Sequence, residues 1–179
     1  MIKILIGVVI ATIAVIGVFL VLDPNTGITT VGTNDAAEVA KNTFTVTIEG
    51  AVYKPGSYTI EDNSTMEDLI DAAGGTTSSA DDRAFYNEAI IVSGMTYYIA
   101  SKFDATDLCS NTELEKVNIN YDDATTLSSI SGITTTIANS IVSYRSSTGL
   151  FSTIEQLQEV YGIGSATYKK IRNYVILHE

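Results

Sequence analysis

Apolar and polar residues form several distinct patterns along this chain of 179 residues. The first is an uncharged run from Ile4 to Leu22, in which only Thr12 interrupts apolar residues and glycines. As a helix rising about 1.5 Å per residue, the run would span about 28 Å, close to the roughly 30 Å hydrocarbon core of a bilayer. Residues 1–22 are therefore predicted to form a transmembrane anchor.

A cleaved signal peptide is the alternative to a retained anchor. Such a peptide has a shorter apolar region followed by small residues, whereas this run ends in the bulky residues 19–22. The bulky end favours retention. Because Lys3 precedes the run and Asp23 follows it, the positive-inside rule places the N-terminus in the cytoplasm and the bulk of the chain outside the cell membrane.

Two segments have no apolar period and are predicted to connect the other parts. Residues 23–43 are rich in Thr, Gly, Asn and Asp, which is typical of a flexible spacer. Residues 102–116 form a second polar linker, which is acidic in its later part.

The strand patterns of residues 44–101 predict a small α+β domain. Apolar and polar residues alternate over residues 44–49 with the two-residue period of a half-buried strand. Pro55 and Gly56 occupy the positions that a type II turn favours, and this turn leads into a second strand over residues 58–60.

The rest of this domain is predicted to contain one helix and a closing hairpin. Ser64 and Glu67 have the spacing of a capping box at a helix start, and Gly74-Gly75 would end that helix. Residues 89–92 and 95–100 are apolar runs separated by a Ser-Gly pair, which predicts that they pair as a hairpin.

The last pattern is an internal repeat offset by thirty residues within residues 117–179. The segment 127–133, Leu-x-x-Ile-Ser-Gly-Ile, recurs over residues 157–163 as Leu-x-x-Val-Tyr-Gly-Ile. Each copy predicts a helix, a tight turn and a second helix, with an apolar stripe on each helix. Residues 117–179 are therefore predicted to form an all-α domain of paired helix-hairpin-helix motifs.

The glycine turns of this repeat predict an anion-binding surface. Glycine lets the chain turn sharply with no Cβ in the way, while the isoleucine can point inward. Since the next helix starts at once, its free N–H groups and positive dipole end would face a phosphate. Two such ends, related by a pseudo-twofold axis, suit the two strands beside a minor groove, and contacts to phosphate and sugar carry no base code. The candidate DNA-binding residues are Gly132, Ile133, Thr134, Gly162, Ile163, Gly164, Ser165, Lys169 and Lys170.

The net charge of −11 argues against a nucleic-acid partner until its distribution is considered. Residues 1–116 carry sixteen acidic and six basic residues, whereas residues 117–179 carry five acidic and four basic residues. Three of these four cations crowd into residues 169–172. The acidity therefore belongs to the front of the chain, although a solvated helix face is the alternative interpretation of the basic cluster.

The sequence offers little for catalysis. Cys109 is the only cysteine, so neither an internal disulfide nor a Cys-based zinc site can form. His178 is the only histidine and is predicted to be a solvent-exposed end residue. Acidic residues are not spaced for metal ions and no phosphate-binding P-loop is present. We therefore expect a protein that is not an enzyme and has no catalytic residues, metal or cofactor.

The motifs resemble two known families. Residues 46–52, 54–56 and 69–75 resemble the soluble-ligand-binding β-grasp (SLBB) domain. Residues 117–120, together with the glycine turns, resemble the paired helix-hairpin-helix domain of the ComEA competence proteins, the DNA receptors of natural transformation. The order of anchor, SLBB domain and terminal hairpins is also that of the Gram-positive members.

This resemblance implies a membrane-anchored, extracytoplasmic receptor that binds double-stranded DNA for uptake. It also implies the ComEC channel as a partner and homo-oligomers formed through the SLBB domain. The alternative is a surface scaffold or adhesion protein, which would use the SLBB and hairpin domains for glycan or protein contacts.

The chain departs from the ComEA pattern at several positions. Thr134 replaces the usual glycine of the first turn, and Ile137 and Ala166 stand where a lysine is common. These changes predict that the second hairpin makes most DNA contacts while the first braces it.

The helix starts of the two repeats are also ambiguous. Tyr121 replaces the expected helix-opening threonine, so Asn120 or Asp122 should cap that helix. The second copy opens with either a Thr153-x-x-Gln156 or a Ser152-x-x-Glu155 cap, and both alternatives stay open.

Overall fold

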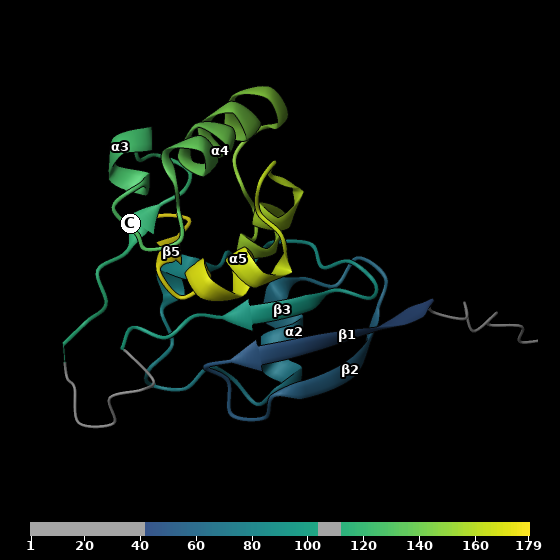
Figure 1. Cartoon of the computed structure of the whole chain (residues 1–179). Coiled ribbons are helices and arrows are strands. Elements are labelled where there is room, and N and C mark those ends of the chain that lie inside the picture. The colour runs from purple at the N-terminus through teal and green to yellow at the C-terminus, as the bar shows by residue number, and fades with distance from the viewer. Residues whose placement is uncertain (1–41, 104–111) are drawn as a thin grey trace, which may run out of the picture. The chain divides into compact units, whose positions relative to one another are not determined.

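The structure is a computed structural model that describes residues 42–103 and 112–179, which belong to one compact unit (Figure 1). The predicted transmembrane anchor and most of the predicted spacer lie outside the described residues. Within the part of the chain that the structure describes, no helix has the length and hydrophobicity needed to cross a bilayer.

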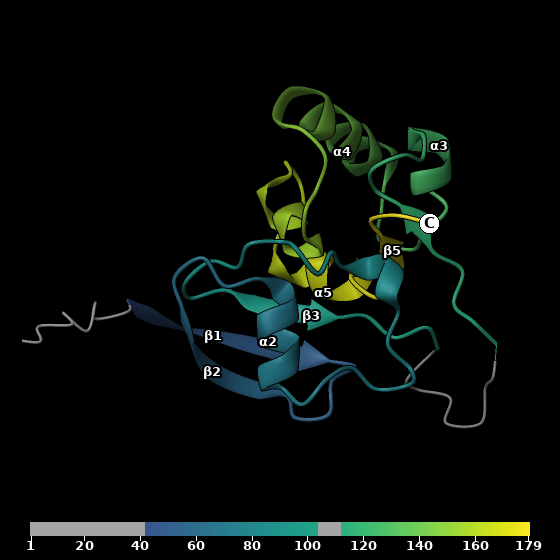
Figure 2. The ribbon, with the colours of Figure 1, turned by 180° about the vertical axis from the view of Figure 1, so that it is seen from behind.

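The first domain is built on a three-stranded sheet. The strands are β1 (Thr43–Gly50), β2 (Gly56–Glu61) and β3 (Thr96–Ile99), in the order β2-β1-β3. β2 is antiparallel to β1, and β3 is parallel to it. Helix α2 (Met66–Ala72) crosses one face of this sheet, where Leu69 packs with Val46 and Ile48 in the core (Figure 2).

The predicted closing hairpin is wrong. Residues 89–92 form no strand and contribute only an isolated bridge between Ile90 and Thr65. The N–H of Val92 donates to the hydroxyl of Tyr97, 2.7 Å away, and not to a neighbouring strand. β3 pairs with β1 because β1 has a second edge that β2 leaves free.

Helix α2 begins one residue later than its predicted capping box. The carboxylate of Asp68 accepts from the N–H of Thr65 at 2.8 Å, and the Thr65 hydroxyl accepts from the Asp68 N–H at 3.4 Å. Ser64 is not the N-cap residue, because its carbonyl accepts from the N–H of Ile91 in the adjoining loop and not from a helical N–H. The predicted glycine end is confirmed, since Gly74 and Gly75 both have positive φ.

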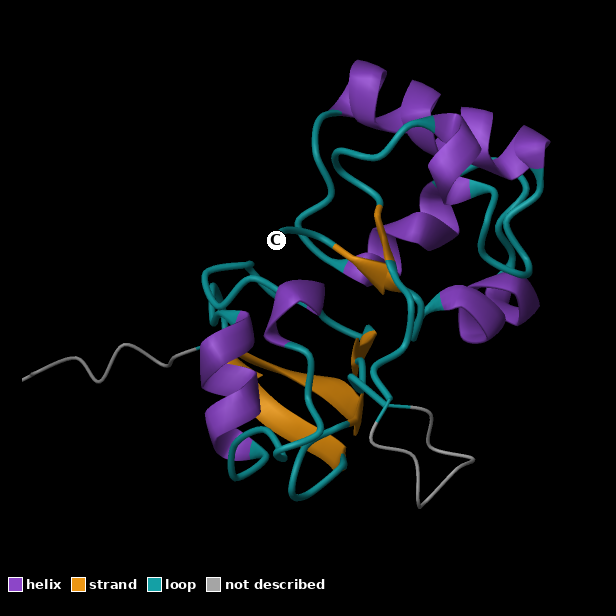
Figure 3. Ribbon diagram, turned by 90° about the vertical axis from the view of Figure 1, so that its left-hand side faces the viewer, coloured by secondary structure: helices purple, strands orange, loops and turns teal. Residues whose placement is uncertain are grey.

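The second domain contains the predicted repeat (Figure 3). Its helices are α3 (Ala124–Leu127), α4 (Thr135–Thr148), the 3-10 helix η2 (Ile154–Glu159) and α5 (Ser165–Ile171). The predicted stripes are confirmed, because Leu127 and Leu157 are both fully buried in one core. The domain is not purely α-helical, since β4 (Val117–Asn118) and β5 (Val175–Ile176) form a short parallel ladder. The first domain also contains a 3-10 helix, η1 (Asp82–Ala84), which lies between α2 and β3 in the sequence.

Helix α3 is capped by neither of the two expected residues. The carboxylate of Asp123 accepts from the N–H of Thr126 at 2.8 Å and forms the cap. Asp122 instead accepts from the N–H of Asn118, and Asn120 is buried. Both expected residues are therefore used to fix the segment that precedes the helix.

The ambiguity at the second repeat is resolved in favour of Thr153 and Gln156. The Gln156 side chain accepts from the N–H groups of Ser152 and Thr153, at 2.7 and 3.3 Å. Glu155 is turned inward and is only 2% exposed. It therefore does not act as the alternative cap.

Candidate nucleic-acid interface

The two glycine turns have the expected geometry. Gly132 and Gly162 have φ values of 113° and 92°, a region that side chains other than glycine rarely adopt. Ile133 and Ile163 are buried directly after them, which confirms that the isoleucines point inward. Gly164 has an ordinary φ of −88°, and an added Cβ there would meet nothing within 4 Å. Gly164 therefore leaves the backbone at the start of α5 uncovered by a side chain.

Each turn packs against the second helix of the other repeat. A Cβ on Gly132 would lie 3.0 Å from Cγ2 of Ile171 and 3.1 Å from Cδ of Lys170, both on α5. A Cβ on Gly162 would lie 3.4 Å from Cγ1 of Ile137 on α4. The turn glycines therefore allow the close approach of the two repeats, in addition to the backbone conformation.

The starts of the two turn-following helices differ. At α4 the hydroxyl of Thr134 accepts from the N–H of Ile137 at 3.3 Å, so the helix caps itself. At α5 the cap is Gly164, and no side chain of the described residues bonds to the first amide groups. The second hairpin therefore has more free donors for an external anion, as the departure at Thr134 predicted.

The two lysines both lie on α5 but line different hollows, so they do not form one cluster. Lys170 lines a hollow of about 360 Å³ beside the first turn, together with Ser131. Lys169 lines a separate hollow of about 350 Å³ that also contains Ser165, at the start of α5. None of the ion pairs found between described residues involves either lysine. Each hollow thus contains one lysine without an ion pair to a described residue, and each also contains one carboxylate residue, Glu115 beside Lys170 and Glu49 beside Lys169.

The other two cations of this domain are engaged elsewhere. The guanidinium of Arg172 lies 3.6 Å from the centre of the Tyr98 ring, and its Nη1 is 3.1 Å from Oε2 of Glu49. Arg145 donates to the backbone carbonyls of Ile119 and Asp122, at 2.8 and 2.6 Å. The predicted basic cluster is therefore divided, and Arg172 serves the contact with the first domain.

Glu155 also connects the two domains. Its Oε1 accepts from the N–H of Tyr98 on β3 at 2.8 Å and from the hydroxyl of Tyr168 on α5 at 3.0 Å. Burial raises the pKa of Glu155, although these hydrogen bonds partly oppose the shift. Nothing in the sequence distinguishes this inward carboxylate from an exposed helix-capping one.

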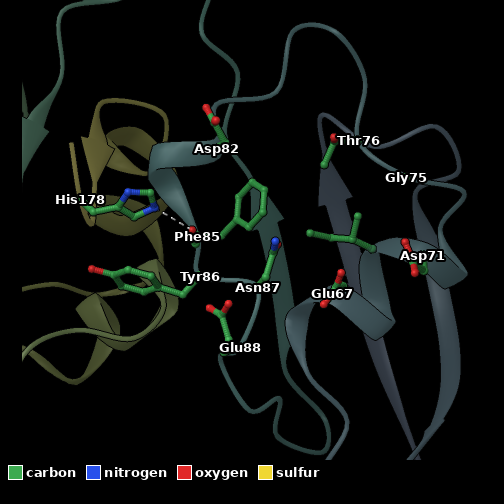
Figure 4. Close-up of a pocket in the computed structure, with 11 residues that line it drawn as sticks. Glu67, Asp71, Gly75, Thr76, Asp82, Phe85, Tyr86, Asn87, Glu88 and His178 are labelled. Atoms are coloured by element: carbon green, nitrogen blue, oxygen red, sulfur yellow. Dashed lines mark hydrogen bonds between the residues drawn. The ribbon is translucent and has the colours of Figure 1, made fainter.

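One hollow, lined mainly by residues of the first domain, has the wrong charge for DNA. This hollow of about 530 Å³ is lined by four carboxylate residues, together with aromatic side chains (Figure 4). The carboxylates are Glu67, Asp71, Asp82 and Glu88. Among the described residues, no group of His, Cys, Asp and Glu could hold a metal ion. A phosphate would be repelled here, which leaves the hairpin turns as the candidate DNA surface.

The prediction of an exposed His178 is wrong. Its ring stacks on Tyr86, with 4.8 Å between the ring centres, and its Nε2 lies 3.1 Å from the carbonyl oxygen of Phe85 (Figure 4). The backbone ladder of β5 carries the C-terminal segment to this position.

Comparison with known proteins agrees with both domains. Residues 112–176 match the helix-hairpin-helix motif, and residues 45–100 match the SLBB domain. ComE operon protein 1 of Bacillus subtilis is 30% identical over 145 residues, which cover 76% of this chain and 71% of that protein. An uncharacterized protein of Haemophilus influenzae is 44% identical over 63 residues, covering 35% of this chain and 56% of the relative. The chain therefore belongs to the ComEA family, the family of ComE operon protein 1.

Proposed function

We propose that this protein is a membrane-anchored, extracytoplasmic receptor that binds double-stranded DNA without sequence specificity for uptake in natural transformation. In this role it binds and does not catalyse. Its membership of the ComEA family and its helix-hairpin-helix motif support DNA binding in competence. The apolar run from Ile4 to Leu22 supports the anchor.

The pair of glycine turns is the observation that carries the proposal. Each turn presents backbone over a buried isoleucine. Lys170 lines a hollow beside the first turn and Lys169 one at the start of α5, and neither forms an ion pair with the described residues. Amide groups and lysines of this kind bind the phosphates of a duplex, which carry no base information. The binding should therefore depend on the duplex backbone and not on its sequence.

Two partners follow from the family and belong to the same proposal. The anchor would hold captured DNA close to the ComEC channel. The SLBB domain would bring several copies together, so that weak single contacts with one DNA molecule add through multivalency.

One observation favours a second candidate function, a surface scaffold or adhesion protein. The hollow of the SLBB domain combines four carboxylate residues with Phe85, Tyr86 and His178. Carboxylates accept hydrogen bonds from sugar hydroxyls, and aromatic rings pack against sugar rings. Such a hollow suits a glycan better than DNA.

Replacement of Gly164 by valine tests the DNA proposal. The position has an ordinary φ and open space around it, so Gly164→Val should fold normally but cover the start of α5. The full chain in detergent should then lose most of its affinity for a labelled duplex, measured by fluorescence anisotropy, while its circular dichroism stays unchanged.

Gly56→Val is the matched control, because Gly56 in the SLBB domain also has open space around it. This variant should bind DNA like the unmodified protein. If Gly164→Val binds duplex as tightly as Gly56→Val does, the proposed site is wrong.

A further inference from the structure

One hollow is lined by both domains. This hollow of about 350 Å³, called here the interdomain groove, contains Lys169 and Ser165, two of the candidate DNA-binding residues. It follows one face of α5, because its residues from this helix and its C-cap are spaced three or four apart. They are Ser165, Tyr168, Lys169 and Arg172. Glu49 and residues 94–96 line the groove from the SLBB domain.

Arg172 is held at this groove by two residues of the SLBB domain. Its Nη1 lies 3.1 Å from Oε2 of Glu49 on β1, and its guanidinium lies 3.6 Å from the centre of the Tyr98 ring on β3. Both partners of the ion pair remain in contact with solvent, since 20% of the Arg172 side chain and 47% of the Glu49 side chain are exposed. A second positive charge therefore lines the groove beside Lys169, but a carboxylate of the same protein already neutralises it.

The ion pair occupies the group that is best suited to bind a phosphate. A guanidinium binds carboxylates and phosphates in the same way, through parallel N–H groups. Glu49 and a phosphate of a duplex would therefore compete for the same donors of Arg172. An ion pair with exposed partners contributes little to stability, so its loss to DNA would cost the fold little.

We propose that Glu49 is an internal competitor of DNA, a carboxylate of the SLBB domain that masks Arg172 and keeps the affinity of the interdomain groove for a duplex low. This inference rests on the proposed function. It gives the SLBB domain an effect on DNA binding within a single molecule. Because affinity differences between related complexes lie mostly in the dissociation rate, the masked groove would release a bound duplex faster than an unmasked one.

Glu49→Gln in the full chain tests this inference. Glutamine keeps the size of the side chain and can still accept a hydrogen bond from Arg172, but it removes the negative charge. The unmasked guanidinium should add one phosphate contact, so duplex binding should tighten and the slope of log K against log salt should become steeper by about one. Anisotropy titrations with a labelled duplex at several salt concentrations measure both quantities.

Glu88→Gln is the matched control for the change in net charge. Glu88 is an exposed carboxylate of the same domain that lines a different hollow, and none of the ion pairs between described residues involves it. This variant should leave the salt slope close to that of the unmodified chain.

Arg172→Gln supplies a second control. In this background Glu49→Gln has no cation to unmask, so the double variant should have the same salt slope as Arg172→Gln alone. Circular dichroism of all four variants should match that of the unmodified protein, because each replacement is made at the solvent-accessible surface.

The outcomes separate this inference from the proposed function. The inference alone is overturned if the unmodified chain binds duplex but Glu49→Gln has the same slope as Glu88→Gln. It is also overturned if Glu49→Gln steepens the slope equally in the Arg172→Gln background. If the unmodified chain ignores duplex even in dilute buffer, both proposals fail.

Discussion

The carboxylate of Glu155 is buried without an ion pair among the described residues, which is an unusual situation for a charged group. Burial of a charge costs free energy unless hydrogen bonds compensate, and Tyr98 N–H and Tyr168 hydroxyl supply two of them. The pKa of Tyr168 is raised by its burial and by the adjacent Glu155. The side chain thus holds β3 of the SLBB domain and α5 of the hairpin domain together.

Stability should depend on the ionisation of this group. Because the folded-state pKa of Glu155 lies above its ordinary value of 4.5, the folded protein binds this proton more tightly than the unfolded chain does. This contribution to the free energy of unfolding therefore falls as the pH rises above 4.5. Glu155→Gln keeps the shape and removes the charge.

We expect the stability of the unmodified protein, relative to Glu155→Gln, to increase as the pH is lowered from 7 to 4.5. Urea unfolding of both proteins over this range measures the difference. A difference that stays constant with pH would show that Glu155 does not ionise with a shifted pKa.

Single residues show the limits of sequence reasoning at this scale. The turn glycines could be predicted because the repeat places both before an inward isoleucine. The different surroundings of Lys170 and Arg172 could not be predicted, because helical positions two apart point in different directions. The partners of Arg172 also come from a distant part of the chain. Glu49 and Tyr98, which hold Arg172, belong to strands of the other domain.

At the scale of elements, the starts of α4 and α5 distinguish two otherwise similar hairpins. The hydroxyl of Thr134 accepts a hydrogen bond from the N–H of Ile137 in its own helix. Gly164 has no side chain to do the same, so the first N–H groups of α5 receive no side-chain cap. The two cap residues also occupy equivalent positions of the repeat, thirty residues apart. They can therefore be exchanged without altering the rest of either hairpin.

The exchange should move DNA affinity in opposite directions. Gly164→Thr would satisfy one amide internally and Thr134→Gly would release one. A neutral hydrogen bond contributes about 0.5–1.5 kcal/mol, so each change should shift the dissociation constant by a few-fold, weaker for Gly164→Thr and tighter for Thr134→Gly. Anisotropy titrations with duplex DNA measure both.

Stability serves as the control for the exchange. Threonine and glycine at the N-cap stabilise a helix equally to within a few tenths of a kcal/mol. Gly164→Thr should therefore have the same free energy of unfolding as the unmodified protein. Weaker binding by a protein of unchanged stability would locate the effect at the amides. Equal affinities for both variants would contradict the role given to them.

The elements also show which parts of the fold the sequence specifies. Periodicity predicted β1, α2 and the apolar stripes of the repeat, because each extends over enough residues to show a period. The ladder of β4 and β5 could not be predicted, because strands of two residues are too short to show a period. The two strands are also far apart in the sequence, one at each end of the hairpin domain. The apolar run of residues 95–100 predicted β3 as a strand. Its parallel pairing with β1 could not be predicted, because the local sequence does not specify which free edge of the sheet a strand joins.

At the scale of the described molecule, the two domains share several specific contacts. Side chains of the hairpin domain accept from two backbone amides at the end of the sheet, Glu155 from Tyr98 N–H and Asn173 from Ser101 N–H at 2.8 Å. In the linker, directly before β4, Lys116 forms a buried ion pair of 2.8 Å with Asp81 of the SLBB domain. The contacts of Glu155 and Asn173 thus join the SLBB domain to η2 and to the segment that follows α5, the helix that carries both lysines.

The buried Asp81 is held in its charged form. Burial alone would raise its pKa, but hydrogen bonds from Arg83 and Lys116 outweigh this effect and lower the pKa below the ordinary value of 3.8. Loss of this ion pair would leave the buried ammonium of Lys116 without its partner, which is costly. The linker and the SLBB loop are thus fixed to each other near β4.

The charge distribution limits how the proposed receptor could bind DNA. Most of the chain is acidic, and of the four cations in residues 117–179 two are engaged in protein contacts. In the proposed receptor, binding would therefore depend mainly on backbone amides, with a small contribution from counterion release. Such a receptor would retain DNA at salt concentrations that weaken proteins with many lysine and arginine contacts.

The salt dependence of duplex binding by the full chain tests this account most directly. With about two phosphates neutralised by the two available lysines, the slope of log K against log salt should be roughly −2 and equal for duplexes of unrelated sequence. Failure to bind any duplex in dilute buffer, or affinities that differ widely between sequences, would contradict it.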